Sequence, residues 1–124
     1  MNQPLWQPSA GRVAHTNMTA FIAHARDQWQ VDIADYAGLY RWSIEAPEQF
    51  WQSVWKFCGV IAATPGGHVL VDGDRMPGAR WFHDAHLNFA QNLLRRRDDG
   101  IALIFRGEDR VAGRITYAEL HSEV

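Results

Sequence analysis

The fold is decided by residues 47–59, which read PEQFWQSVWKFCG. The large apolar side chains of this stretch are spaced i, i+1, i+4, i+5 and i+8, which places them along one broad face of a helix. They are Phe50, Trp51, Val54, Trp55 and Cys58. Pro47 stands where proline is accepted at the first helical position, and Gly59 stands where a glycine commonly ends a helix. The pattern therefore predicts an amphipathic helix whose aromatic face must pack against other elements.

Two further helices are expected before this one. Thr16 or Asn17 can cap a segment from residue 18 to about residue 30, in which apolar residues recur at helical spacing. Asp35 is a good N-cap for a second, shorter helix. The apolar residues of that helix are Leu39, Tyr40 and Trp42. The N-terminal half of the chain is thus predicted to be helical.

The middle of the chain is expected to be extended and rich in loops. Turn clusters at residues 64–67 (TPGG) and 72–74 (DGD) flank a short β-branched run, residues 69–71. Another turn follows at Pro77 and Gly78, and residues 80–82 can form a second short strand.

A helix and a hairpin are expected next. Residues 88–97 predict a helix with Phe89, Leu93 and Leu94 on its inner side, and three arginines in its last turn would complement the helix dipole. Residues 101–105 (IALIF) are nearly all apolar, as expected of a strand covered on both faces. The turn that follows returns the chain into residues 114–116, which predicts a hairpin.

The C-terminal segment begins a helix with strong local signals. Thr116 and Glu119 have the spacing of a capping box, and Ile115 and Leu120 have that of a hydrophobic staple. An isolated helix shorter than about 12–15 residues is marginal in water. We therefore expect this helix to continue beyond Val124, and the sequence to be the front of a longer protein.

Composition excludes several classes of function. The sequence has 124 residues, of which 47% are hydrophobic, and a formal net charge of −2, so it offers no basic surface for nucleic acid. Its first eight residues lack the features of a signal peptide, and no apolar run reaches the roughly 18 residues of a membrane span. These features predict a cytoplasmic protein with neither nucleic acid nor membrane as partner. Cys58 is the only cysteine, which excludes an internal disulfide, and it is expected to be buried.

Some motifs suggest chemistry that the sequence does not complete. His83, Asp84 and His86 lie close together, but the sequence identifies no third or fourth convergent metal ligand beside them. Residues 64–68 (TPGGH) lack the Gly-Lys-Ser/Thr of a phosphate loop, and residues 72–74 lack the other oxygen ligands of a calcium loop. The six tryptophans at helical spacing are expected to form core, or a surface that docks on another part of the same protein.

One resemblance is specific. Residues 80–94 (RWFHDAHLNFAQNLL) resemble the signature in the N-terminal region of acyl-CoA synthetases of the acetyl-CoA synthetase type. Residues 4–9 (PLWQPS), 40–51 and 55–60 are similar to the branch of that family that activates acetoacetate. Residues 102–108 and 115–120 resemble the first strands and helix of the family's AMP-binding domain. The resemblance covers essentially the whole chain.

The resemblance implies an α+β fragment with a helical N-terminal region at residues 1–99 and the beginning of an AMP-binding, adenylate-forming domain at residues 100–124. The parent would be an AMP-forming acid–thiol ligase that converts acetoacetate, ATP and CoA to acetoacetyl-CoA, AMP and pyrophosphate through an acyl-adenylate, with Mg²⁺. In the family the catalytic parts lie in later domains. We therefore expect no catalytic, cofactor-binding or metal-binding residue in this chain, no activity and no bound cofactor for the chain alone, and the remainder of the catalytic domain as its partner. Lys56, the only lysine, is expected to be structural.

Two alternatives remain open at the level of sequence. The same region could belong to an acetyl- or propionyl-CoA synthetase, because the acid pocket is expected beyond residue 124. The chain could instead be a free-standing interaction module that uses its aromatic face on a partner. The length of the open reading frame discriminates between ligase and module.

Overall fold

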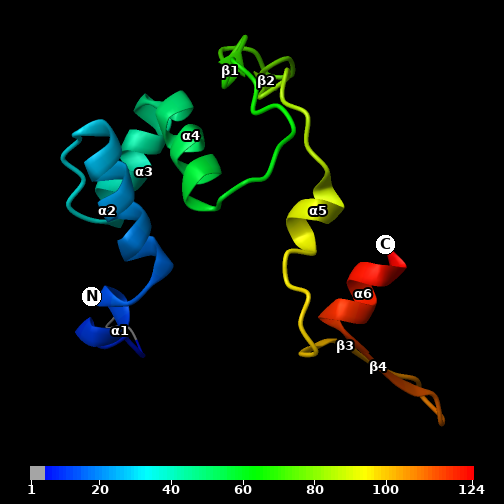
Figure 1. Cartoon of the computed structure of the whole chain (residues 1–124). Helices are drawn as coiled ribbons and strands as arrows, with labels where there is room; N and C mark the ends of the chain where they lie inside the picture. The colour runs from blue at the N-terminus through cyan, green and yellow to red at the C-terminus, as the bar shows by residue number, and fades with distance from the viewer. Residues whose placement is uncertain (1–4) are drawn as a thin grey trace. The chain divides into compact units, whose positions relative to one another are not determined.

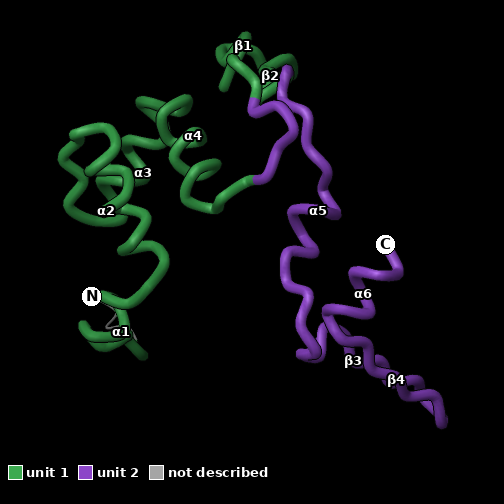
Figure 2. Tube along the Cα trace, viewed as in Figure 1, with its two compact units in different colours: residues 1–60, 66–83 green, residues 61–65, 84–124 purple. Residues whose placement is uncertain are grey.

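The computed structural model describes residues 5–124, which form two compact units. Among the described residues, unit 1 comprises residues 5–60 and 66–83, and unit 2 comprises residues 61–65 and 84–124 (Figure 2). Pro4, in the first of the family-like blocks, lies outside the described residues. None of the helices in the described part of the chain is long and apolar enough to cross a bilayer.

Unit 1 is built from four helices and one small sheet (Figure 1). The helices are α1 (Ala10–Ala14), α2 (Asn17–Trp29), α3 (Tyr36–Glu45) and α4 (Pro47–Phe57). The two-residue strands β1 (Leu70–Val71) and β2 (Arg80–Trp81) pair antiparallel. The three helices and two strands predicted here are confirmed, and α1 is an additional short helix that the sequence did not indicate.

The helix boundaries follow from local hydrogen bonds. Thr16, rather than Asn17, caps α2, and its hydroxyl accepts from the Thr19 backbone N–H at 3.2 Å. The Asp35 carboxylate caps α3 by accepting from the Gly38 N–H at 2.8 Å. Gly59, with φ of 59°, takes the left-handed conformation just after α4.

The core of unit 1 lies where α2, α3 and α4 pack together. Its buried side chains are Phe21, Ala25, Ile33, Leu39 and Trp42. One polar residue joins them, because Ser53 on α4 is fully buried. Its hydroxyl accepts from Trp29 Nε1 at 2.7 Å and donates to the Gln49 carbonyl at 2.9 Å, so its hydrogen-bonding capacity is used inside the core.

The apolar stripe of α4 is only partly buried. Trp51 remains 44% exposed, and Cys58, which follows the helix as its C-cap, is exposed, so the prediction of a buried cysteine was wrong. The stripe is wider than the surface that α2 and α3 cover. Its outer aromatic residues instead contact the small sheet. Trp51 meets Trp81 edge to face at 5.8 Å between ring centroids, and Trp55 packs on Phe82 at 4.6 Å.

Unit 2 contains two helices and a hairpin. They are α5 (Phe89–Leu93), β3 (Ile101–Arg106), β4 (Ala112–Thr116) and α6 (Tyr117–Glu123). The Asn92 side chain joins α5 to the segment before it, since its amide oxygen accepts from the Ile61 N–H at 2.8 Å and its amide nitrogen donates to the Ile61 carbonyl at 2.7 Å. The predicted hairpin and capping box are confirmed: Thr116 and Glu119 exchange backbone-to-side-chain bonds of 2.8 and 3.1 Å.

The helix predicted at residues 88–97 is shorter than expected. It ends at Leu93, and Arg95 and Arg96 after it bind the side chains of Asn92 and Asp98. Arg96 Nε donates to Asp98 at 2.6 Å, and its guanidinium lies 4.4 Å from the Tyr117 ring centroid. Backbone bonds from Tyr117 to Gly100 and from Ala118 to Asp98 hold this turn against α6. These contacts favour an extended path over another helical turn.

Two predictions of burial in unit 2 were wrong. Phe89 and Leu93 are 75% and 66% exposed, and of the expected inner residues of α5 only Leu94 is buried. Strand β3 is not covered on both faces, because Ile104 and Phe105 are 62% and 60% exposed. Among the described residues, the sheet that contains β3 has two strands only.

Candidate functional site

An apolar groove of about 410 Å³ opens between the helices of unit 1. Its walls come from α2, α3 and α4 and include Met18, Phe21, Leu39, Phe50, Val54 and Phe57. No charged side chain lines it, and its polar groups are those of Asn17, Ser43, Cys58 and two tyrosines. Such a surface suits an apolar segment, and it lacks the cationic groups needed to hold phosphates.

Lys56, the only lysine of the sequence, contacts the side chain of Gln28. Lys56 is exposed near the end of α4, and its Nζ lies 3.2 Å from the Gln28 side-chain oxygen when that amide is oriented to satisfy its neighbours. In the same orientation the Gln28 amide nitrogen donates to His24 Nε2 at 3.3 Å. These contacts tie α4 to α2.

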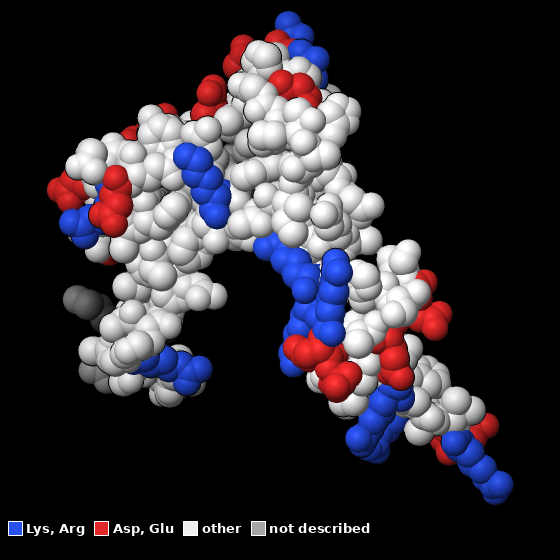
Figure 3. All heavy atoms as spheres, viewed as in Figure 1, with Lys and Arg blue, Asp and Glu red and all other residues white. Residues whose placement is uncertain are grey.

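Several charged side chains outside this groove form hydrogen bonds with residues close to them in sequence. Hydrogen bonds from Arg96 and from the Gly100 N–H lower the pKa of Asp98, and the bond to Asp98 raises the pKa of Arg96. The bonds from Thr116 lower the pKa of Glu119. On the face drawn in Figure 3, basic and acidic groups lie next to one another along the C-terminal segment. This surface does not gather charge of one sign for a nucleic acid.

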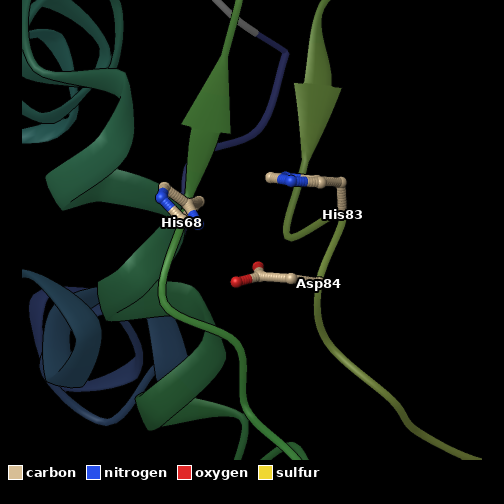
Figure 4. Close-up of side chains that lie close together, drawn as sticks. All are labelled: His68, His83 and Asp84. Atoms are coloured by element: carbon tan, nitrogen blue, oxygen red, sulfur yellow. The ribbon is translucent and has the colours of Figure 1, made fainter.

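The side chains that cluster around His83 and Asp84 differ from those that the sequence suggested. The metal-type pattern was His83, Asp84 and His86, but the backbone of His86 forms an isolated β-bridge with Thr64, and its side chain does not belong to the cluster. His68 takes its place. One ligand atom from each of His68, His83 and Asp84 lies within 4.8 Å of the others (Figure 4).

The proximity of His68 and His83 could have been predicted from the pairing of the two short strands. In the ladder Leu70 pairs with Trp81 and Val71 with Arg80, so the same register places His68 opposite His83. Pairing the two predicted short strands as one hairpin would have brought these histidines together.

Comparisons with known proteins agree over the whole chain. Residues 36–93 match the family model described as the acetyl-coenzyme A synthetase N-terminus. The chain is 45% identical over 122 residues to the acetoacetyl-coenzyme A synthetase of Rhizobium meliloti (strain 1021), a match that covers 98% of this chain. The solved acetoacetyl-CoA synthetase from Streptomyces lividans superposes on 96% of the chain with a TM-score of 0.86 and 40% identity. Over residues 36–93 the chain therefore carries an N-terminal region of the acetyl-coenzyme A synthetase type.

These matches confirm the resemblance and the α+β fold class, which combines helices with small antiparallel sheets. The chain spans 19% of the length of the Rhizobium relative and 19% of the Streptomyces structure. Another relative, the malonamoyl-CoA synthetase of Penicillium aethiopicum, is 32% identical over 127 residues, which cover 97% of this chain and 17% of that protein.

Proposed function

We propose that this chain is the N-terminal part of an AMP-forming acid–thiol ligase that acts on acetoacetate. The observation that carries the proposal is similarity along the whole chain, at 45% identity, to a protein named acetoacetyl-coenzyme A synthetase. In the proposed reaction a carboxylate oxygen of acetoacetate attacks the α-phosphorus of ATP, and pyrophosphate leaves. The sulfur of CoA then attacks the acyl carbon of the adenylate, and AMP leaves with the bonding electrons. ATP, CoA and Mg²⁺ are the cofactors of the parent.

The role of this chain within the ligase is structural. We place the helical N-terminal region at residues 1–99 and the opening of the AMP-binding domain at residues 100–124. The exposed hairpin supports this division, because β3 and β4 carry large apolar side chains that a two-stranded sheet cannot cover. Ile104, Phe105 and Val111 are each at least 60% exposed. The remainder of the catalytic domain is the proposed partner of this surface.

The catalytic groups are proposed to lie outside this chain. The groove between α2, α3 and α4 is apolar, and the only lysine of the sequence lies beside Gln28. The residues that select the acid substrate are also proposed to lie outside this chain. The Penicillium relative, named for a different acid, is 32% identical to this same region, so similarity here is compatible with more than one acid substrate.

An activity assay on the full-length protein tests the ligase. The protein is incubated with ATP, Mg²⁺, CoA and one acid at a time, and AMP and acyl-CoA are measured. We expect equimolar AMP and acetoacetyl-CoA, with acetate and propionate as poorer substrates. A preference for acetate or propionate would assign the parent to another branch. Failure with every short acid would overturn the ligase and favour an interaction module.

Calorimetry on the 124-residue chain tests the placement of the catalytic groups. Titration with ATP and Mg²⁺ is expected to give no saturable heat, because the phosphate-binding parts lie elsewhere. Saturable binding at micromolar ATP would show that the nucleotide site includes this region.

A further inference from the structure

We propose that His68, His83 and Asp84 form a binding site for one Zn²⁺ ion. The inference concerns this chain alone and does not depend on the ligase reaction. Two imidazoles and one carboxylate are a ligand set that zinc uses when it keeps an open coordination position for water.

The β1–β2 hairpin is what brings the two histidines together. Phe82 N–H donates to the Val69 carbonyl at 2.9 Å, which continues the register of Leu70 with Trp81 beyond the two-residue strands. The next pair outward is His68 and His83. Side chains directly opposite each other on antiparallel strands are near neighbours. The two imidazole centroids accordingly lie 5.4 Å apart, with an interplanar angle of 40°.

Asp84 supplies the third ligand. It is bonded directly to His83 in the chain, and Figure 4 shows both side chains extending toward the segment that carries His68. Zinc bonds of about 2.0–2.1 Å in tetrahedral geometry put neighbouring ligand atoms roughly 3.3 Å apart. The ligand atoms here lie within 4.8 Å of one another. Because both histidines are exposed, rotation of their side chains can close this difference without disturbing the core.

The ligand types select the class of ion. Mg²⁺ and Ca²⁺ prefer sites built entirely from oxygen, whereas imidazole nitrogen favours zinc and its transition-metal neighbours. Bound zinc would also join the two strands of a sheet that has only two ladder pairs. We therefore expect Zn²⁺ to raise the melting temperature of the chain, since an ion that binds the folded state stabilises it.

Calorimetric titration of the full 124-residue chain with Zn²⁺ tests the site. We expect saturable binding of one ion per chain at micromolar concentration. His68→Gln and His83→Gln are each expected to weaken binding at least about tenfold, because even partners outside the coordination sphere contribute that much to metal affinity. Asp84→Asn is expected to weaken it as well. Circular dichroism verifies that each variant remains folded.

His86→Gln is the matched control. His86 is also exposed and lies two residues beyond Asp84, but its side chain is not in the cluster, so this variant should bind Zn²⁺ as the native chain does. Absence of binding to the native chain would overturn the proposal. Unchanged affinity in any of the three ligand variants, or an equal loss in His86→Gln, would also overturn it.

Discussion

The partly buried hydrogen bond between Trp29 and Ser53 gives the sharpest test of how unit 1 is held together. Ser53→Ala removes the hydroxyl that accepts from Trp29 Nε1 at 2.7 Å, at a position with no exposed surface. Leaving a buried donor without its partner costs about 1–3 kcal/mol. Alanine recovers roughly 0.5 kcal/mol through its better helix propensity. The Gln28 side-chain oxygen, 3.3 Å from the same indole nitrogen, limits the loss. We expect a net destabilisation of about 1–2 kcal/mol.

Urea unfolding followed by circular dichroism measures this cost. Ser43→Ala is the matched control, because Ser43 is a partly buried helical serine whose hydroxyl donates to the Tyr40 carbonyl of its own helix at 2.7 Å. It should change the free energy of unfolding by less than about 0.5 kcal/mol. A double-mutant cycle with Trp29→Phe should give a coupling energy of at least about 0.5 kcal/mol. Equal effects of the two serine variants, or a cycle without coupling, would refute the buried bond as a determinant of stability.

Three further predictions follow from individual contacts. Truncating the partly buried Trp55, which packs on Phe82, to alanine should destabilise the full-length protein by about 1.5–3 kcal/mol in denaturant melts, and truncating Trp51, which is 44% exposed, should cost less. A loss below about 0.5 kcal/mol at Trp55 would show that this face is not packed. The pKa of Glu119 is lowered by the bonds from the Thr116 backbone and hydroxyl, so the stability it gives α6 is present above the ordinary pKa of 4.5 and is lost as the pH falls through the lowered value. Glu119→Gln should remove this acid dependence of α6 in an NMR titration, and an unchanged profile would refute the assignment. Finally, amide exchange of residues 116–124 should be fast in the 124-residue chain and slow in the full-length protein, because α6 is too short to persist without tertiary contacts. Equal, strong protection in both would show that the chain completes its own core.

Local signals in the sequence correctly located the starts of α2, α3 and α6 and the end of α4. Thr16, Asp35 and the pair of Thr116 and Glu119 each satisfy backbone donors within three residues, and Gly59 adopts the left-handed conformation that ends a helix. Interactions of such short range depend on sequence spacing alone. The family resemblance likewise depended on short ordered blocks, and the comparisons confirmed it.

The errors concern contacts between residues that are distant in sequence. The turn at Arg96 to Gly100 is held by Tyr117 and Ala118, so helical periodicity could not show that α5 ends at Leu93. The exposure of β3 and of Cys58 depends on which surfaces other elements cover. An apolar residue type indicates that a side chain favours burial, but it does not indicate whether another element packs over that side chain.

The sequence by itself therefore determined the order of helices and strands from α2 onward, the caps at Thr16, Asp35 and Thr116, and the resemblance to known synthetases, because these depend on neighbours within a few residues or on ordered motifs. The tertiary structure alone decided that Ser53 is the buried polar residue of α4, that Trp51 and Trp55 face the small sheet, and that His68 rather than His86 joins His83 and Asp84. The physical reason is that antiparallel pairing and helix packing bring together groups far apart along the chain. Their partners are set by register and by surface shape, which no local spacing specifies.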